Sequence, residues 1–422
     1  MKAITLAIYL LLFGVSLWLK HLNIKYLKER GHQVPPEFGK AIDSETLRRT
    51  IAYTVKTSRL GIVASILNTL LLLFFLFGGL IIVYDGWIAS LSGSFVTRGV
   101  FFVLGLLYVE TIFSIPFSLY RNFNIESRYG FNTMTGRLWL SDLLKSTAIS
   151  TILLAGLVAV ALALVSYSPG WWWLWVWGVF LLFSIFLMYI SPYLIEPLFF
   201  KFEPVRSDGL EEEIRALVEK AGLKVNKVFQ VDASRRSRHS NAYFSGIGRV
   251  KRIVLFDTLL ETMSNPEILA VLAHELGHWK KKHVVKRIIL TEVVALGVIF
   301  LAFKLLSWQG LLTMVGLEQG SFYVRVTILG FLGSLLMFPF TPVLSFLSRK
   351  HEWQADRFAC KLTGQPSDLA RALVKLSKDN LANLHPHPLY AAFYYSHPPV
   401  VERVRHLQNQ EASGHSSQLA SC

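Results

Sequence analysis

Seven apolar segments, each about long enough to cross a lipid bilayer, constrain the fold of this chain more than any other feature. They lie at about residues 3–19, 60–84, 99–120, 148–167, 174–193, 288–307 and 326–348. A helix needs about 20 apolar residues to span the hydrocarbon core, where only helices and closed barrels satisfy their backbone hydrogen bonds. With 53% hydrophobic and 17% charged residues, the composition excludes an ordinary soluble domain. The sequence therefore predicts an all-α integral membrane protein with seven transmembrane helices.

The basic residues gather on one side of this predicted arrangement. The net charge is +15, and segment 20–59 alone holds nine Lys and Arg residues; segments 121–147 and 194–287 are basic as well. The connections on the opposite side hold only Arg98 and Arg325; they lie near 85–98, 168–173 and 308–325. Because Lys and Arg collect in cytoplasmic loops, we expect the N-terminus outside or in the lumen and the C-terminus in the cytoplasm. Membrane topology accounts for the charge, so no nucleic-acid partner is expected.

The water-exposed parts of the chain form two separate pieces. The predicted organisation has five parts: spans one to five with cytoplasmic loops 20–59 and 121–147 (1–193), a first cytoplasmic region (194–287), spans six and seven (288–348), a second cytoplasmic region (349–408) and a polar tail (409–422). Two crossings separate the cytoplasmic regions, so both lie on the same side and can form one composite domain. The tail is low in complexity and is expected to be disordered.

The first cytoplasmic region combines helical and strand patterns. An amphipathic helix is predicted at 210–221, and Val/Ile/Phe-rich strands at 227–231 and 251–256. Between these strands, Asn241, Ala242 and Tyr243 precede a glycine-containing turn. A hairpin with an exposed edge strand fits this pattern, and such an edge can bind an extended peptide by strand addition. From the spacing alone, an ordinary hairpin is equally compatible.

Residues 274–278, His-Glu-Leu-Gly-His, carry the clearest chemical signal. On a helix, His274 and His278 project from one face and can bind a single Zn²⁺. Glu275 is then next to the first ligand and can act as a general base toward water. The preceding Ser264-Asn265-Pro266-Glu267 segment is a capping-box pattern, which supports a helix here. The pentapeptide can also occur by chance, so the rest of the chain has to support it.

A catalytic zinc site needs a third protein ligand besides two histidines. The second cytoplasmic region offers Glu352, which follows directly from the seventh apolar segment. Asp356 lies one helical turn further on the same face, where it can accept a hydrogen bond from a ligating histidine. In isolation Glu352 would be a solvated helix residue, but the neighbouring motif needs a carboxylate on this side of the membrane. We therefore predict Glu352 as a metal ligand and Asp356 as its supporting partner.

Two further residues are candidates for stabilising a developing negative charge. His397 stands between Ser396 and two prolines, which restrain its backbone, and Arg403 follows at a spacing that could reach the same cleft. Spacing alone equally fits a turn histidine and a surface arginine. Three other histidines flank the motifs without recognisable ligand spacing: His239, His283 and His351.

Taken together, these segments resemble one known family. The chain is similar to the type-1 C-a-a-X prenyl proteases, which are multi-spanning zinc metalloproteases of the a-factor-converting type. The resemblance covers roughly residues 120–407. It rests on an ordered set of segments: 128–132 (Arg-Tyr-Gly-Phe-Asn), 197–199, 239–244, 251–259, 274–279, 352–356 and 395–399.

The resemblance implies a fold, a cofactor and a set of roles. It implies seven helices forming a barrel around a water-filled chamber, with a gluzincin-type zinc domain carrying a small β-sheet at the cytoplasmic end. One Zn²⁺ per chain would be bound, and its expected ligands are His274, His278 and Glu352. The expected supporting roles are Glu275 as general base, Asp356 as a partner of a ligand, His397 and Arg403 as transition-state contacts, and Asn241, Ala242 and Tyr243 as the substrate-binding strand.

The implied reaction is hydrolysis of a peptide bond near the C-terminus of a prenylated protein or peptide, with release of the last three residues. The partners would be this lipidated substrate and the lipid bilayer, in the endoplasmic reticulum or a bacterial inner membrane. Two alternatives remain open from the sequence. One is a general quality-control protease for membrane proteins without a prenyl requirement. The other is a catalytically idle membrane scaffold, against which the intact His274, Glu275, His278 and Glu352 set argues.

Overall fold

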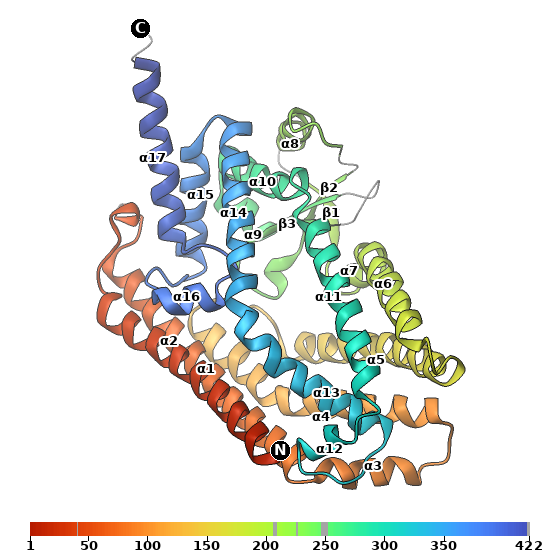
Figure 1. Cartoon of the computed structure of the whole chain (residues 1–422). Coiled ribbons are helices and arrows are strands. Elements are labelled where there is room, and N and C mark those ends of the chain that lie inside the picture. Colours follow the sequence, from red (N-terminus) through yellow and green to blue (C-terminus); the bar gives the residue numbers. More distant parts are fainter. Residues whose placement is uncertain (40, 206–208, 225–226, 246–251, 420–422) are drawn as a thin grey trace.

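The computed structural model describes the chain except for residues 40, 206–208, 225–226, 246–251 and 420–422 (Figure 1). In the described part, seven helical segments are long and apolar enough to cross a membrane. Their bounds are Lys2–Arg30, Ser44–Phe77, Phe95–Glu126, Gly136–Tyr167, Trp172–Phe199, His283–Leu305 and Phe322–Thr363. The prediction of seven spans is therefore confirmed.

Within the residues that the structure describes, these seven segments are built from nine α-helices. The helices are α1 (Lys2–Arg30), α2 (Ser44–Leu72), α4 (Phe95–Tyr120), α5 (Gly136–Tyr167), α6 (Trp172–Ile190), α7 (Glu196–Phe199), α11 (His283–Leu305), α13 (Phe322–Met337) and α14 (Thr341–Thr363). Short π-helical or 3₁₀ turns extend α2, join α6 to α7 and join α13 to α14. Several of these helical segments extend well beyond the apolar stretches predicted from the sequence, for example Ser44–Phe77 and Phe322–Thr363. Each continues without a break past one end of its apolar stretch.

The second span ends earlier than predicted. It stops at Phe77 rather than near residue 84, because Gly78 and Gly79 interrupt the helix and Gly79 adopts φ of 81°. That backbone conformation costs glycine little and other residues much more. The apolar residues that follow form a separate short helix, α3 (Leu80–Ser90).

The spans follow one another around a barrel. Helix α1 contacts α2, α2 contacts the end of the third span, and α4, α5, α6 and α11 contact one another in that order. Helix α13 packs against both α1 and α3, and this contact brings the last span back to the first (Figure 1). Between α4 and α5, polar side chains including Ser114, Ser118 and Asp142 line a cavity of about 270 Å³.

A small four-stranded sheet lies outside the spans. Its strands are β1 (Phe202–Pro204), β2 (Lys227–Val231), β3 (Ala242–Ser245) and β4 (Arg252–Phe256), in the order β1-β2-β4-β3. Strands β3 and β4 pair in antiparallel register and β3 lies at the edge. The predicted hairpin is therefore confirmed; its turn, 246–251, lies outside the described residues.

The remaining helices lie outside the seven spans. They are α8 (Leu210–Lys220), α9 (Asp257–Thr262), α10 (Asn265–Lys280), α12 (Gly310–Thr313), α15 (Pro366–Asp379), α16 (Pro388–Tyr394) and α17 (Val400–Leu419). Helix α8 coincides with the predicted helix at 210–221. Helix α12 instead belongs to the connection between the sixth and seventh spans.

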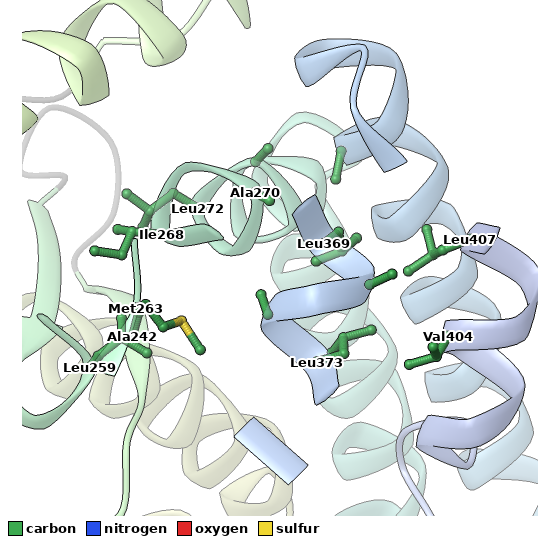
Figure 2. Packing of buried hydrophobic residues seen from close by; sticks show 14 of the residues in the cluster. Ala242, Leu259, Met263, Ile268, Ala270, Leu272, Leu369, Leu373, Val404 and Leu407 are labelled. Carbon is green, nitrogen blue, oxygen red and sulfur yellow. The ribbon is translucent and has the colours of Figure 1, made fainter. Parts of the chain in front are cut away.

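Helix α10 lies at the centre of the water-exposed part. Its Ile268 and Leu272 are buried in one hydrophobic core with Leu369 of α15 and Leu407 of α17 (Figure 2). Burying a leucine side chain contributes about 1.5–3 kcal/mol, so these contacts hold the three helices firmly together. Segments before and after the last two spans thus share one core, and the shared core fixes α10 against α14 and α17.

Helix α17 continues into the C-terminal tail. It runs to Leu419, and the expected disorder of residues 409–422 stays a prediction. The core contacts of Val404 and Leu407 nucleate this helix. Extending an existing helix is much easier than starting one, and the residues after Leu407 include the good helix formers Gln408, Gln410 and Glu411.

Candidate metal centre

Helix α10 presents the two histidines of the motif. Its N-terminus is closed by a capping box in which Ser264 and Glu267 satisfy each other's backbone N–H groups. The four-residue spacing then places His274 and His278 on one face, with their Nε2 atoms 3.2 Å apart. The predicted pairing of these two side chains is therefore what the structure shows.

Helix α14 brings a carboxylate to the same point. The Glu352 oxygens lie 3.4 Å from His274 Nε2 and 3.3 Å from His278 Nε2. One donor atom from each of these three residues lies within 4.8 Å of the other two. The Oε2 atom of Glu352 is buried without a hydrogen-bond partner, which is costly unless another group binds it. Two imidazole nitrogens and a carboxylate oxygen are ligands that zinc accepts, so the residues fit a metal ion.

Asp356 and Arg403 support this cluster from behind. The Asp356 Oδ1 atom lies 2.7 Å from His274 Nδ1, so the far nitrogen of this ring faces Glu352. Arg403 donates two hydrogen bonds to Asp356, of 2.9 and 2.6 Å, and its Nη1 lies 3.8 Å from Glu352. Asp356 is 1% exposed and Arg403 7%. Arg403 is therefore buried and paired with Asp356, which in turn contacts the His274 ring.

Electrostatics at the site reflect this crowding of charges. Burial disfavours the charged form of His274, but hydrogen bonds to Asp356 and Glu352 outweigh it and raise its pKa to about 9. A bound cation needs the neutral ring and would displace this proton. Burial raises the pKa of Glu275 above its usual range. A carboxylate with a raised pKa is suited to accept and return a proton near neutral pH.

A cavity of about 330 Å³ opens beside the cluster. His274, Glu275 and Glu352 line one side, and Asn241 and Ala242 from the start of β3 line another. His397 and Arg403 also line it. Seven of the ten predicted site residues therefore line this cavity. His278 and Asp356 contact His274 beside it, whereas the Tyr243 side chain pairs with Glu196 instead.

His397 and the β3 residues differ in how they face the cavity. The His397 side chain is 63% exposed, with Nε2 3.5 Å from Glu352 Oε1. Asn241 is exposed and uses its side-chain oxygen to accept a hydrogen bond from Ala242 N. The Tyr243 hydroxyl instead donates to Glu196 of α7. Tyr243 can therefore contribute through its backbone, while its side chain ties the strand to the fifth span.

The contact between His278 and His283 was not predicted from the sequence. His283 Nδ1 lies 3.0 Å from His278 Nδ1, although the two residues are five positions apart. A continuous helix would place them on different faces. The chain turns at Lys282, where φ is 56°, and this turn returns His283 to the histidine pair. A positive φ at lysine has no reliable sequence signal, so spacing could not find this contact.

A helical membrane barrel with a His-His-Glu cluster beside a buried carboxylate defines a multi-spanning membrane metallopeptidase. Residues 23–201 match the family described as "CAAX prenyl protease N-terminal, five membrane helices", and residues 204–411 match "Peptidase family M48". The chain belongs to the CAAX prenyl protease family of these membrane metallopeptidases. The predicted resemblance is thereby confirmed.

Known relatives match nearly the whole chain. The CAAX prenyl protease 1 homolog of Arabidopsis thaliana is 35% identical, over 88% of this chain and 89% of that protein. The Homo sapiens homolog is 33% identical, over 97% and 96%. The crystal structure of S. mikatae Ste24p superimposes with a TM-score of 0.87 at 30% identity, covering 96% of this chain and 98% of that one. The predicted fold class is confirmed.

Proposed function

We propose that this protein is a zinc metalloendopeptidase that cleaves prenylated CaaX-type proteins or peptides near their C-terminus and releases the last three residues. The observation that carries the proposal is the convergence of His274, His278 and Glu352 within 4.8 Å, with Glu275 in the same cavity. The relatives named CAAX prenyl protease 1 supply the substrate class.

The metal would be held by the two α10 histidines and Glu352. A zinc ion there would supply a Lewis acid, which acidifies water and polarises the scissile carbonyl. Asp356 holds the His274 ring in the orientation that ligation requires. Arg403 holds Asp356 in turn and keeps it ionised in a buried setting.

Glu275 is the proposed general base and acid. It takes a proton from the attacking water as the water oxygen bonds to the scissile carbon. It then returns this proton to the leaving nitrogen as the carbon–nitrogen bond breaks. The products are a new carboxylate and a free amine. His397, exposed to the cavity beside Glu352, is our first candidate to stabilise the negative charge on the carbonyl oxygen. Arg403 is the second, although its pairing with Asp356 gives it an orienting role first.

The substrate backbone would bind along β3. Phe256 N donates to Asn241 O, and backbone groups alternate sides along an antiparallel strand. Ala242 and Phe244 therefore direct their backbone groups to the free edge. An extended peptide can pair with this edge, close to Glu275 across the cavity. Asn241, Ala242 and Tyr243 would together form this binding strand.

Cleavage of a CaaX peptide by the purified full-length protein tests the proposal. The peptide is offered with and without its prenyl group, before and after chelation of metal. We expect chelator-sensitive cleavage of the prenylated peptide only. Equal cleavage of both peptides would instead support the quality-control protease, and absence of cleavage with zinc bound would overturn the proposed substrate.

The Glu275→Gln variant tests the proposed base. It should keep zinc and lose about 100- to 10,000-fold in cleavage rate. The matched control is Glu261→Gln on the exposed face of α9, which should cleave at the wild-type rate. Unchanged cleavage by Glu275→Gln would exclude this residue as the base.

A further inference from the structure

We propose that His283 is a positioning residue of the metal centre. It accepts a hydrogen bond from His278 and so fixes His278 in the tautomer whose Nε2 is free to bind metal, while Gln354 sets the direction of this hydrogen-bond chain. The inference rests on the proposed function, because it requires that His278 bind zinc.

Three side chains form a continuous hydrogen-bonded row. His278 Nδ1 lies 3.0 Å from His283 Nδ1, and His283 Nε2 lies 2.8 Å from Gln354 Oε1. On the other side of the first ring, His278 Nε2 lies 3.3 Å from Glu352 Oε1. His283 is 4% exposed, so water has little access to the row. Every ring nitrogen in it therefore has a defined neighbour.

The hydrogen-bond partners along the row determine which nitrogen of His283 and which nitrogen of His278 carries a hydrogen. The Gln354 oxygen can only accept, so His283 Nε2 carries its hydrogen and donates to it. The other nitrogen of a neutral His283 is then an acceptor. His278 Nδ1 must carry a hydrogen to donate to it, which leaves the lone pair of His278 on Nε2, directed at Glu352. A reversed row would put the hydrogen on His278 Nε2 and block ligation.

A backbone turn at Lys282, rather than regular helical spacing, brings these side chains into one row. Lys282 adopts the left-handed conformation, which non-glycine residues rarely adopt, and it turns the chain so that the first residue of α11 faces back to α10. The ring of His351 stacks on His283 at 4.1 Å with an angle of 11°. Helix α14 thus supports His283 with two side chains, His351 and Gln354.

The two ligating histidines consequently have different partners. His274 is paired with a carboxylate, which Arg403 neutralises. His278 is paired with a neutral imidazole ending on an amide. The second arrangement orients the ring without adding negative charge next to Glu352 and Glu275. Partners of this kind typically change metal affinity by about 10- to 100-fold.

Zinc affinity of the full-length protein in detergent tests the inference. The apo-protein competes with a chromophoric zinc chelator, and the cobalt-substituted form gives an absorption spectrum of the ligand field. His283→Phe keeps the ring and its stacking on His351 but removes both nitrogens. We expect zinc binding about 10- to 100-fold weaker and a shifted cobalt spectrum, with the melting temperature of the apo-protein unchanged. KM for the peptide at saturating zinc should be unaltered.

One variant restores the acceptor and another removes the end of the row. The side-chain oxygen of His283→Asn replaces Nδ1, and this variant should recover affinity to within about threefold of wild type. Gln354→Leu removes the acceptor at the end of the row and should bind zinc more weakly. His21→Phe on the exposed face of α1 is the matched control, with wild-type affinity expected.

The outcomes separate this inference from the proposed function. If wild type binds zinc and His283→Phe binds it equally, the positioning role is excluded while the proposed function stands. Failure of His283→Asn to recover affinity also excludes it. If wild type binds no zinc, the proposed function itself fails. If His283→Phe gives no melting transition, the Gln354→Leu variant decides: wild-type zinc affinity of this variant overturns the inference.

Discussion

At Gly277, the absence of a side chain determines how closely two helices approach. A Cβ atom there would lie 2.9 Å from the Ala355 Cα and 3.1 Å from its carbonyl oxygen. Because both neighbours are backbone atoms of α14, they cannot move aside individually. The third position after His274 is thus small for a physical reason, namely that Glu352 must reach the histidines from α14.

We predict that Gly277→Ala separates α10 from α14. Overpacking should cost about 1–3 kcal/mol of stability and weaken zinc binding at least about tenfold, because Glu352 moves away from both histidines. Thermal unfolding and chelator competition measure the two effects. Gly297→Ala in α11 is the control, since nothing lies within 4 Å of its added methyl group; equal behaviour of both variants would refute the close-approach argument.

Asp356 makes a second prediction at the residue scale. Asp356→Asn keeps an oxygen for His274 but removes the carboxylate to which buried Arg403 donates two hydrogen bonds. Removing one partner of a buried ion pair costs about 3–5 kcal/mol, and loss of the carboxylate should weaken zinc binding about 10- to 100-fold. Asp368→Asn serves for comparison, because its partner Arg371 is 58% exposed and such pairs contribute less than about 1 kcal/mol. An Asp356→Asn protein as stable as Asp368→Asn would contradict this account.

The sequence could predict the residues whose positions follow from helix geometry. The spacing of His274 and His278, and that of Glu352 and Asp356, sufficed because each pair lies on one regular helix. The sequence could not reveal that two guanidinium nitrogens of Arg403 donate to Asp356, since this contact depends on how α17 packs. His283 was missed because a single backbone angle at Lys282, rather than any periodicity, places it.

At the scale of elements, helix α10 depends on its N-terminal cap for its attachment to α15. Glu267 accepts hydrogen bonds from the Ser264 backbone and from Lys375 of α15, at 2.9 and 2.6 Å. Burial opposes ionisation of Glu267, but these two donors outweigh it, so its pKa lies below the usual range. The same carboxylate therefore starts the metal-binding helix and ties it to its neighbour.

The lowered pKa of Glu267 predicts how stability depends on pH. A carboxyl group whose pKa is lower in the folded state stabilises the fold above its unfolded pKa of about 4.3. This contribution is lost as the pH falls through the lower, folded pKa. At pH 7, Glu267→Gln should lower the stability by about 1–2 kcal/mol. The lower part of this range is expected because Lys375 is partly exposed.

Unfolding of the metal-free protein at two pH values checks this prediction. The difference between wild type and Glu267→Gln should be clear at pH 7 and should shrink below about pH 4. Glu212→Gln on the exposed face of α8 should match wild type at both values. A difference that persists unchanged into acid would show that the carboxylate charge has no part in the effect.

Strands with a regular apolar pattern could be predicted from the sequence, whereas a very short strand could not. Strands β2 and β4 are rich in Val, Ile and Phe, and both were found in the sequence. Strand β1 has three residues, of which one is Pro204, so its pairing depends on β2 rather than on its own propensity.

At the scale of the whole molecule, the distribution of Lys and Arg orients the barrel. We propose that the loops at 20–59 and 121–147 face the cytoplasm together with the metal centre. The connection at 168–173 would lie on the opposite side. The positive-inside rule predicts this arrangement, and the seven spans place the two chain ends on opposite sides.

Labelling of introduced cysteines tests this orientation. In a background carrying Cys360→Ser and Cys422→Ser, His32→Cys and Gly170→Cys each place one thiol in an exposed position. In sealed vesicles with the cytoplasmic side outward, a membrane-impermeant maleimide should label His32→Cys and leave Gly170→Cys unreacted until detergent is added. The reverse pattern would invert the topology.

The separation of the proposed metal ligands along the chain has a consequence for biosynthesis. His274 and His278 are synthesised before the sixth span, and Glu352 only after the seventh has begun. Arg403, which holds Asp356, follows later still. A nascent chain therefore cannot assemble the proposed centre until its last two helices have inserted and α17 has docked. The proposed proteolytic activity is withheld while these segments are being synthesised, because only a chain with correctly inserted last spans contains the complete site.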